Sequence, residues 1–449
     1  MEIKEINRLF SNMGVTIPDI LLPNKSVDYS KWSVVACDQF TSNKSYWDKV
    51  ASIVGDNPST FKITLPEIFL EDPNKEERIS NINRTMEEYV QNKIFTEHKN
   101  SFVLVDRKTS HTASRKGLIV ALDLEAYDFN KGSQTLIRAT EGTIIDRLPP
   151  RIKIRENASI ELPHIMVLID DPDKSVIEPL FDHTEQLEKL YDFDLMQNGG
   201  HIKGYKIDKA DHLQQIFFAL EKLGNKEFFL ERYSLEGNEK NFGLLLFAMG
   251  DGNHSFATAK AIWEEIKKDL PEEDRKDHPA RYALVELVNV HDDGLAFEPI
   301  HRVVFGCADN LLESAKSYFV SNGMSIEITN ELDTEKENGK HKIPFITENE
   351  KGTIIITNPV QNLEVGTLQG FLDEYIKQTS NKLDYIHGAS EVEDLSTQKG
   401  SNNIGFLLPA MEKSDLFKTV ILDGALPRKT FSMGEAEEKR YYLEARKIK

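Results

Sequence analysis

The sequence predicts an α/β or α+β fold in which helices flank mixed sheets, and three observations favour this class. Short apolar runs of strand length alternate along the chain with longer segments of helical periodicity. With 449 residues, the chain is long enough for two to four domains of ordinary size. Hydrophobic residues make up 39% of it, which is enough for packed cores and too many for a disordered acidic protein.

The first predicted elements are a helix and a group of strands. An amphipathic helix is expected over residues 74–95, where apolar side chains recur on one stripe. Three runs rich in Val, Ile and Leu follow, and polar or Gly positions bound each of them: residues 102–105, 117–122 and 134–137. A sheet is therefore expected after the first helix.

The same alternation continues to the end of the chain. In the middle, two strands and two helices are predicted, the strands over 162–169 and 242–249 and the helices over 176–191 and 209–223. In the last third, a helix is predicted over 363–376 and three strands over 353–357, 382–386 and 404–408.

The boundaries between domains are expected where polar segments interrupt this pattern. Residues 330–342 are almost free of apolar side chains and predict an exposed loop. We divide the chain into an N-terminal α/β region, a core and a C-terminal α/β region, over residues 1–125, 126–320 and 321–449.

The charge of the chain limits its partners. Its 55 Lys and Arg against 74 Asp and Glu give a net charge of −19, which argues against a nucleic-acid or anionic membrane surface. No apolar stretch approaches the roughly 20 residues that span a bilayer, and the first residues lack an apolar signal segment. Cys37 and Cys307 are too few for a disulfide framework. We expect a cytoplasmic protein that acts on a small molecule, and its oligomeric state is not determined by the sequence.

The most distinctive local feature is an apolar strand, a Gly-rich turn and a helix within residues 244–266. The turn has the sequence Gly250-Asp251-Gly252-Asn253-His254. Unpaired N–H groups and the helix dipole make such a helix start a natural anion site. Asp251 could bind a metal ion or accept a proton, and His254 could bind phosphate or act as an acid or base. Simple capping of the helix by Asp or Asn is the alternative, and the Walker pattern of a P-loop is absent.

Five segments in a consistent order resemble the bacterial and archaeal family called domain of unknown function 1015 (DUF1015). The turn GDGNHS at 250–255 is similar to the family's ADGHHR signature. The other four segments are RATEGT at 138–143, followed by Asp146-Arg147, then GLAFEPIHR at 294–302, GFLLP at 405–409 and LPRKT at 426–430.

The resemblance implies a phosphate-binding core. The family's turn resembles that of the ParB/sulfiredoxin-like fold, which includes free serine kinases, so a core of that kind with additional α/β segments is expected. By this analogy, Glu141 is the base for a substrate hydroxyl, and Asp251 assists it or holds Mg²⁺. His254 and the turn around it cradle phosphate, and cations elsewhere complete the anion site. The implied phosphate or substrate ligands are Arg138, Arg147, Gly252, Asn253, Ser255, His301, Arg302 and Lys429.

Two departures from the family pattern affect this interpretation. Ser255 replaces the arginine of the turn, and a serine hydroxyl cannot replace a bidentate phosphate donor. Thr140 stands where the family has His before Glu141. Either other cations supply the charge and the chemistry is retained, or this chain binds a ligand without turnover. Positive charge is available locally, because residues 137–155 hold five Lys and Arg against two acidic residues and residues 428–449 hold seven against four.

Three functions follow as hypotheses. The first is a kinase that transfers phosphate from ATP or ADP, with Mg²⁺, to a hydroxylated metabolite such as an amino acid. The second is a noncatalytic protein that binds phosphate, nucleotide or another metabolite. The third is a Cys/His hydrolase in which Cys37 is the nucleophile and His254 or His301 the base. His164, which lies in an apolar run, is interpreted as a core histidine, and Lys429 either reaches the site or begins a final helix.

Overall fold

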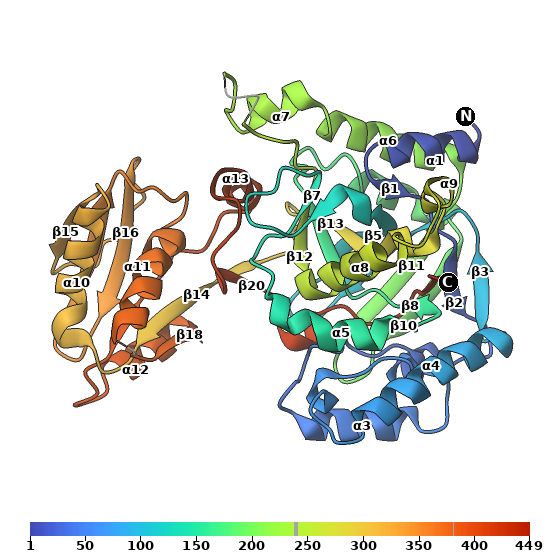
Figure 1. Cartoon of the computed structure of the whole chain (residues 1–449), viewed down its shortest axis with the longest axis horizontal. Helices are drawn as coiled ribbons and strands as arrows, with labels where there is room; N and C mark the ends of the chain where they lie inside the picture. The colour runs from blue at the N-terminus through green and yellow to red at the C-terminus, as the bar shows by residue number, and fades with distance from the viewer. Residues whose placement is uncertain (238–240, 380) are drawn as a thin grey trace. The chain divides into compact units, whose positions relative to one another are not determined.

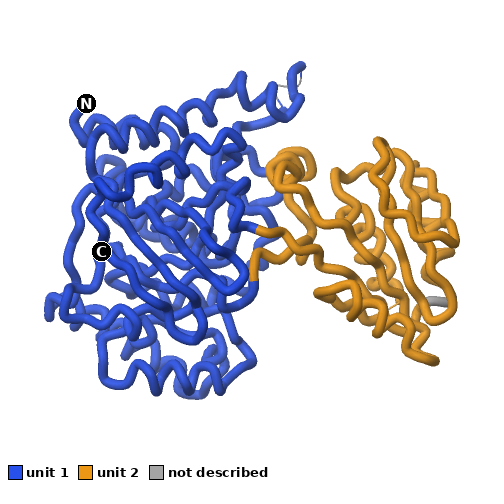
Figure 2. Tube along the Cα trace, turned by 180° about the vertical axis from the view of Figure 1, so that it is seen from behind, with its two compact units in different colours: residues 1–295, 435–449 blue, residues 296–434 orange. Residues whose placement is uncertain are grey.

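The computed structural model of the chain describes residues 1–237, 241–379 and 381–449. These residues form two compact units, which Figure 2 distinguishes by colour. Unit 1 contains residues 1–295 and 435–449, and unit 2 contains residues 296–434. Both units combine sheets with helices, so the predicted α/β class is confirmed (Figure 1). The boundaries placed at 125 and 320 do not coincide with the units, because strands on both sides of residue 125 pair within one sheet.

Unit 1 is built on a ten-stranded mixed sheet. In spatial order its strands are β10 (Lys189–Asp194), β11 (His201–Ile207), β4 (Phe102–Lys108), β5 (Arg115–Asp123), β13 (Tyr282–Asn289), β9 (Met166–Ile169), β12 (Phe247–Asp251), β7 (Ile137–Arg138) and β6 (Tyr127–Asp128), and β1 (Val15–Thr16) pairs with β5. The pairs β13–β9, β12–β7 and β6–β7 are parallel, and the other pairs are antiparallel.

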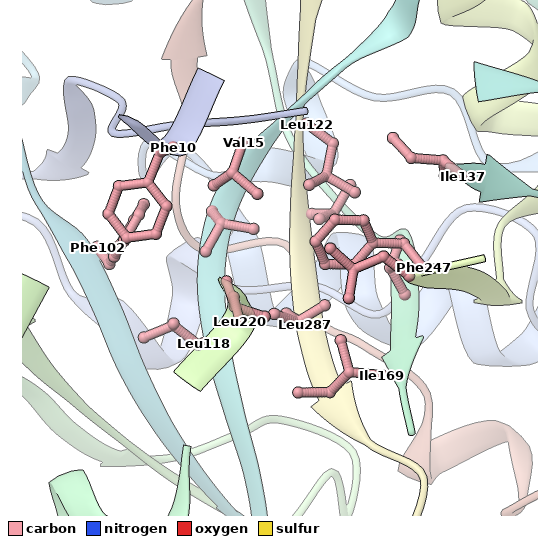
Figure 3. Close-up of a cluster of buried hydrophobic side chains, with 14 of the residues drawn as sticks. Phe10, Val15, Phe102, Leu118, Leu122, Ile137, Ile169, Leu220, Phe247 and Leu287 are labelled. Atoms are coloured by element: carbon pink, nitrogen blue, oxygen red, sulfur yellow. The ribbon is translucent and has the colours of Figure 1, made fainter. Parts of the chain in front are cut away.

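Both faces of this sheet are buried, because alternate residues of its strands enter two different cores. Phe102 and Leu104 belong to one core, together with residues of α1 (Ile3–Ser11), α6 (Ala210–Leu223) and α8 (Asn253–Ile266). Figure 3 shows part of this core. Val103 and Val105 belong to the other, with residues of α3 (Lys44–Val54) and α4 (Lys75–Gln91). The helix predicted over 209–223 is thereby confirmed as α6.

The remaining elements of unit 1 are shorter. They are β2 (Ile20–Pro23), β3 (Phe95–His98), β8 (Ile160–Glu161), β21 (Arg446–Lys447), α2 (Tyr29–Trp32), α5 (Leu148–Arg155), α7 (Lys226–Arg232) and α9 (Glu272–Arg275). No helix among the described residues is long and apolar enough to cross a membrane.

One predicted helix is wrong. Residues 176–191 form 3₁₀ turns over Glu178–Gln186 and then enter strand β10. His183 interrupts the turns with a non-helical backbone (φ −128°, ψ 20°), and the last residues of the segment pair with β11 as a strand instead. The strand predicted over 134–137 is reduced to the two residues of β7.

The last residues of the chain return to unit 1, and we call residues 435–449 the C-terminal strap. Its strand β21 pairs antiparallel with β8, and Ala445 exchanges backbone hydrogen bonds with Leu21. Tyr441 and Leu443 are buried in the core that α3 and α4 cover. The strap is therefore an integral part of unit 1.

Unit 2 contains a seven-stranded sheet. Its order is β15 (Ser325–Thr329), β17 (Lys351–Thr357), β16 (Lys340–Ile346), β19 (Ile404–Phe406), β14 (Phe297–Val304) and β18 (Leu383–His387), with β20 (Phe431–Met433) pairing with β14. Its helices are α10 (Ala308–Ser321), α11 (Glu364–Thr379), α12 (Ala389–Ser396) and α13 (Lys413–Asp423). The helix predicted over 363–376 and the three strands near it are confirmed.

Candidate functional site

The Gly-rich turn connects β12 to α8 in unit 1. Gly252 has a left-handed backbone (φ 80°), and a Cβ atom there would lie 3.1 Å from the Cα of Ile165. Only glycine meets both conditions without strain. Residue 252 ends the strand sharply and starts α8 at Asn253, so the first N–H groups of a 14-residue helix lie directly after Asp251.

Asp251 is held by a cation from the C-terminal strap. The Lys439 ammonium lies 3.1 Å from Oδ2, and the Gly252 N–H donates to Oδ1 at 2.9 Å. Burial raises the pKa of Asp251, but the charge of Lys439 outweighs this effect and the net pKa lies below the ordinary value of 3.8. The carboxylate is therefore ionised at neutral pH, and Lys439 places a positive charge beside the start of α8.

His254 is a neutral imidazole at pH 7. Burial lowers its pKa from 6.5, and the positive charges of Arg151 and Arg147 lower it further. Its Nε2 accepts the Ile144 N–H at 3.3 Å, so the proton of the neutral ring is on Nδ1. Arg147 is exposed at the start of α5, which packs against α8. The predicted phosphate ligands His254 and Arg147 thus lie in one part of unit 1.

Ser255 takes part in a chain of hydrogen bonds. Its Oγ shares a hydrogen bond of 2.9 Å with Nε2 of His164, and Nδ1 of His164 shares one of 2.9 Å with the hydroxyl of Tyr442. The Cys37 N–H donates to the same hydroxyl at 3.2 Å. Pairing of Asp251 with Met166 brings the residues just before β9 to the turn, which explains the position of His164. We call Ser255, His164 and Tyr442 the polar relay.

The segment that contains Glu141 lies along β12. The Thr140 hydroxyl donates to the carbonyl oxygen of Met249 at 2.7 Å, so the residue that departs from the family pattern ties this segment to the strand. Glu141 follows directly and is half-buried. Arg138 is buried, and its guanidinium donates to the carbonyl oxygens of Thr135 and Gly243. Burial lowers the pKa of Arg138 to about 10.

Asn253 contributes an unsatisfied polar atom at the start of α8. Its Oδ1 is buried and has no hydrogen-bond partner among the described residues. Such an acceptor is costly unless a donor reaches it. A ligand hydroxyl or amino group could supply that donor.

Three predicted ligands lie in unit 2. Arg302 is fully buried, and its guanidinium donates to the carbonyl oxygens of Lys429 at 3.0 Å and Arg428 at 3.1 Å and to Gln369 at 2.9 Å. His301 accepts the Leu408 N–H on Nδ1 at 3.0 Å. Within unit 2 the structure therefore brings His301, Arg302 and Lys429 together, and the observed bonds of Arg302 support the fold of that unit.

The residues present do not by themselves form a metal site. Among the described residues, no three His, Cys, Asp or Glu side chains lie close enough to hold a metal ion. The carboxylate of Asp251 is already engaged by Lys439, whose charge would oppose a cation there. The role of Asp251 as a Mg²⁺ ligand stays a prediction.

Cys37 is expected to react slowly with thiol reagents. Burial, followed by the charge of Asp38, raises the pKa of its thiol to about 12, and burial raises that of Cys307 to about 12. Because the thiolate is the nucleophile, we expect the native protein to react with iodoacetamide far more slowly than free cysteine at pH 8, and about tenfold faster for each pH unit up to pH 10. Mass spectrometry of the two cysteine peptides measures this. Rapid labelling of Cys37 at pH 7 would contradict it.

Sequence reasoning missed Lys439, His164 and Tyr442. The excess of Lys and Arg in residues 428–449 was the only signal for Lys439. His164 looked like a core residue because the pairing of β9 with β12 is not visible in the sequence. Tyr442 reaches the turn only because the C-terminal strap returns to unit 1.

Comparisons with known proteins give a family and several distant structures. A family model described as "Protein of unknown function (DUF1015)" matches residues 21–375. No curated protein matches the sequence.

Solved structures with some similarity include a free serine kinase in complex with AMP. It is 12% identical, with a TM-score of 0.39, over 76% of this chain and 95% of that chain. A variant of a free serine kinase in complex with ADP is 12% identical, with a TM-score of 0.38, over 77% and 95%. A conserved hypothetical protein from Pyrococcus furiosus is 14% identical, with a TM-score of 0.34, over 72% and 90%.

Proposed function

This chain belongs to the DUF1015 family of unknown function, and from that premise we propose that it transfers phosphate from a nucleotide to a small hydroxylated molecule. One observation carries the proposal: the ion pair of Asp251 and Lys439 at the start of α8, in a turn whose backbone favours glycine at residue 252. The N–H groups of the first helical turn bind phosphate oxygens, and the Lys439 ammonium beside them can donate to a phosphate while it stays paired with Asp251.

Other cations support a phosphate site despite the loss of the family's arginine at Ser255. Arg147 and Arg151 lie close enough to lower the pKa of His254, so their charge acts at the turn. The proton on Nδ1 of His254 is a further donor for an anion. In the proposed reaction, Glu141 removes the proton from the substrate hydroxyl, and that oxygen forms a bond to the terminal phosphorus of the nucleotide. The bond from this phosphorus to the bridging oxygen breaks, ADP or AMP leaves, and the cations stabilise the charge of the transferred phosphate. ATP or ADP as the donor follows from the resemblance to free serine kinases.

Nucleotide binding tests the first step of this proposal. Lys439→Met should weaken ADP binding at least tenfold, because it removes a cation and leaves the Asp251 carboxylate to repel phosphate. Lys447→Met is the matched control, since Lys447 is also in the strap but pairs with Glu97 at the surface. Titration calorimetry at 50 and 200 mM salt measures both variants. Equal affinity of Lys439→Met and the wild type would rule out the proposed site.

A noncatalytic binding protein is the second candidate, and Ser255 at the arginine position favours it. Both functions predict the same loss of ADP affinity in Lys439→Met. They differ when the protein, ATP, Mg²⁺ and a metabolite mixture are combined and new phosphorylated products are sought by ³¹P NMR. Product formation supports the transferase, and ADP binding without product supports the noncatalytic protein.

A Cys/His hydrolase is less consistent with the site. The raised pKa of the Cys37 thiol keeps it protonated at neutral pH, and Cys37 contacts the polar relay at Tyr442, a phenol and not a general base of the Cys/His type. Retained activity of Cys37→Ala in any future assay would exclude this function.

A further inference from the structure

An apolar cavity lies beside the turn in unit 1. Its volume is about 130 Å³. Its apolar wall is formed by Ile63, Leu65, Leu70, Met86, Ile160 and Leu162, and the polar relay lies on the same lining. A cavity of comparable size in another protein, about 150 Å³, holds benzene. The volume therefore suits a molecule with four to six carbon atoms.

The charged groups around this cavity are paired with one another. Arg151 forms an ion pair with Glu67, and Arg155 forms one with Glu161 at 2.6 Å. A charged ligand would have to break one of these pairs or remain without a counter-charge in an apolar space, and either is costly. The cavity therefore favours a neutral ligand.

The polar relay offers the ligand one well-defined polar contact. Both ring nitrogens of His164 are already bonded within the relay, to Ser255 and to Tyr442. The Ser255 hydroxyl oxygen keeps at least one unused lone pair, which can accept a hydrogen bond from a ligand hydroxyl at the cavity wall.

From these observations we infer that the cavity binds a small neutral alcohol, with its apolar body against the aliphatic wall and its hydroxyl on Ser255. Its use as the acceptor subsite rests on the proposed function. Binding of the alcohol does not. The inference narrows the substrate class to apolar alcohols of four to six carbons and away from charged amino acids.

Ligand-observed NMR titrations without nucleotide or Mg²⁺ test the inference. From n-propanol to n-butanol to n-pentanol, the affinity should rise about fourfold for each methylene, because each is removed from water. Butane-1,4-diol should bind at least tenfold more weakly than n-butanol, since its second hydroxyl would meet the apolar wall. L-Serine should not bind at this cavity.

Two variants locate the binding. Ala158 lines the cavity, so Ala158→Leu should abolish butanol binding by filling it. Ala219→Leu on α6 is the matched control and should bind as the wild type does. Ser255→Ala should weaken butanol about fivefold while the helix remains intact.

The outcomes separate this inference from the proposed function. The alcohol site is supported if affinity rises with alcohol chain length in the wild type and in Ala219→Leu but not in Ala158→Leu. This holds whether or not ADP binds. No butanol binding, unchanged binding in Ala158→Leu, or equal binding of the diol or serine would overturn it. Loss of ADP binding alone would contradict only the phosphate site.

Discussion

Replacing Arg440 with alanine is expected to lower the free energy of unfolding of unit 1 by about 3–5 kcal/mol. Arg440 is a buried residue of the C-terminal strap, and its guanidinium bonds to Glu286 of β13 and to Glu444 of the strap. Its Nε also donates to the carbonyl oxygen of Pro163 at 3.1 Å. Without the guanidinium, two buried carboxylates lose their counter-charge, and this accounts for the large effect.

Glu286 determines how the free energy of unfolding of unit 1 changes with pH. Burial raises the pKa of this carboxyl group, but the charge of Arg440 outweighs the effect and holds the pKa below 4.5. The folded state therefore binds fewer protons than the unfolded state near this pH. The Arg440–Glu286 pair therefore contributes fully to the free energy of unfolding above pH 4.5. This contribution is lost as the pH falls through the lowered pKa of Glu286.

Urea unfolding followed by tryptophan fluorescence measures the loss of stability in Arg440→Ala. All three tryptophans, Trp32, Trp47 and Trp263, lie in unit 1, so the signal reports that unit. Arg84→Ala is the control, because Arg84 pairs with Glu88 on the surface of α4 and should change stability by less than about 0.5 kcal/mol. A change below 1 kcal/mol in the free energy of unfolding of Arg440→Ala would show that the buried ion pairs of Arg440 do not hold the strap.

Glu141→Gln is expected to reduce phosphate transfer by about 10²–10⁴-fold, because the amide cannot accept the proton of the substrate hydroxyl. The affinity for ADP should change by less than about threefold, since Glu141 is proposed to act on the acceptor and not on the nucleotide. This difference between turnover and binding separates a catalytic base from a residue needed only for folding.

The matched control for this variant is Glu156→Gln, a change of the same kind at an exposed residue just after α5. Initial rates with the product-yielding metabolite, together with ADP titrations, give both quantities. Wild-type rates in Glu141→Gln would remove Glu141 from the mechanism. A parallel loss of ADP affinity would reassign it to nucleotide binding.

Local sequence patterns predicted the elements that depend on local interactions. Helix α6 follows from the spacing of its apolar residues, and the turn at Gly252 follows from the glycines between an apolar strand and an amphipathic helix. The segment 176–191 has similar apolar spacing, but its backbone is non-helical at His183 and its last residues pair with β11 as a strand. Periodicity alone therefore does not determine the backbone.

The parts of the site that the sequence did not reveal depend on long-range pairing. Lys439 and Tyr442 reach the turn because the strap crosses back into unit 1, held by Arg440 and by the pairing of β21 with β8. His164 reaches it through the pairing of β9 with β12. These pairings join residues far apart in the sequence, and no local pattern specifies their register.

The most direct test of the proposed phosphate site is a crystal structure of the protein with ADP. Phosphate oxygens are expected within about 2.7–3.2 Å of the N–H groups of residues 253–255, close to the Lys439 ammonium and Nδ1 of His254. Density for the nucleotide at another place, or an ion pair of Asp251 and Lys439 without phosphate at millimolar ADP, would contradict it.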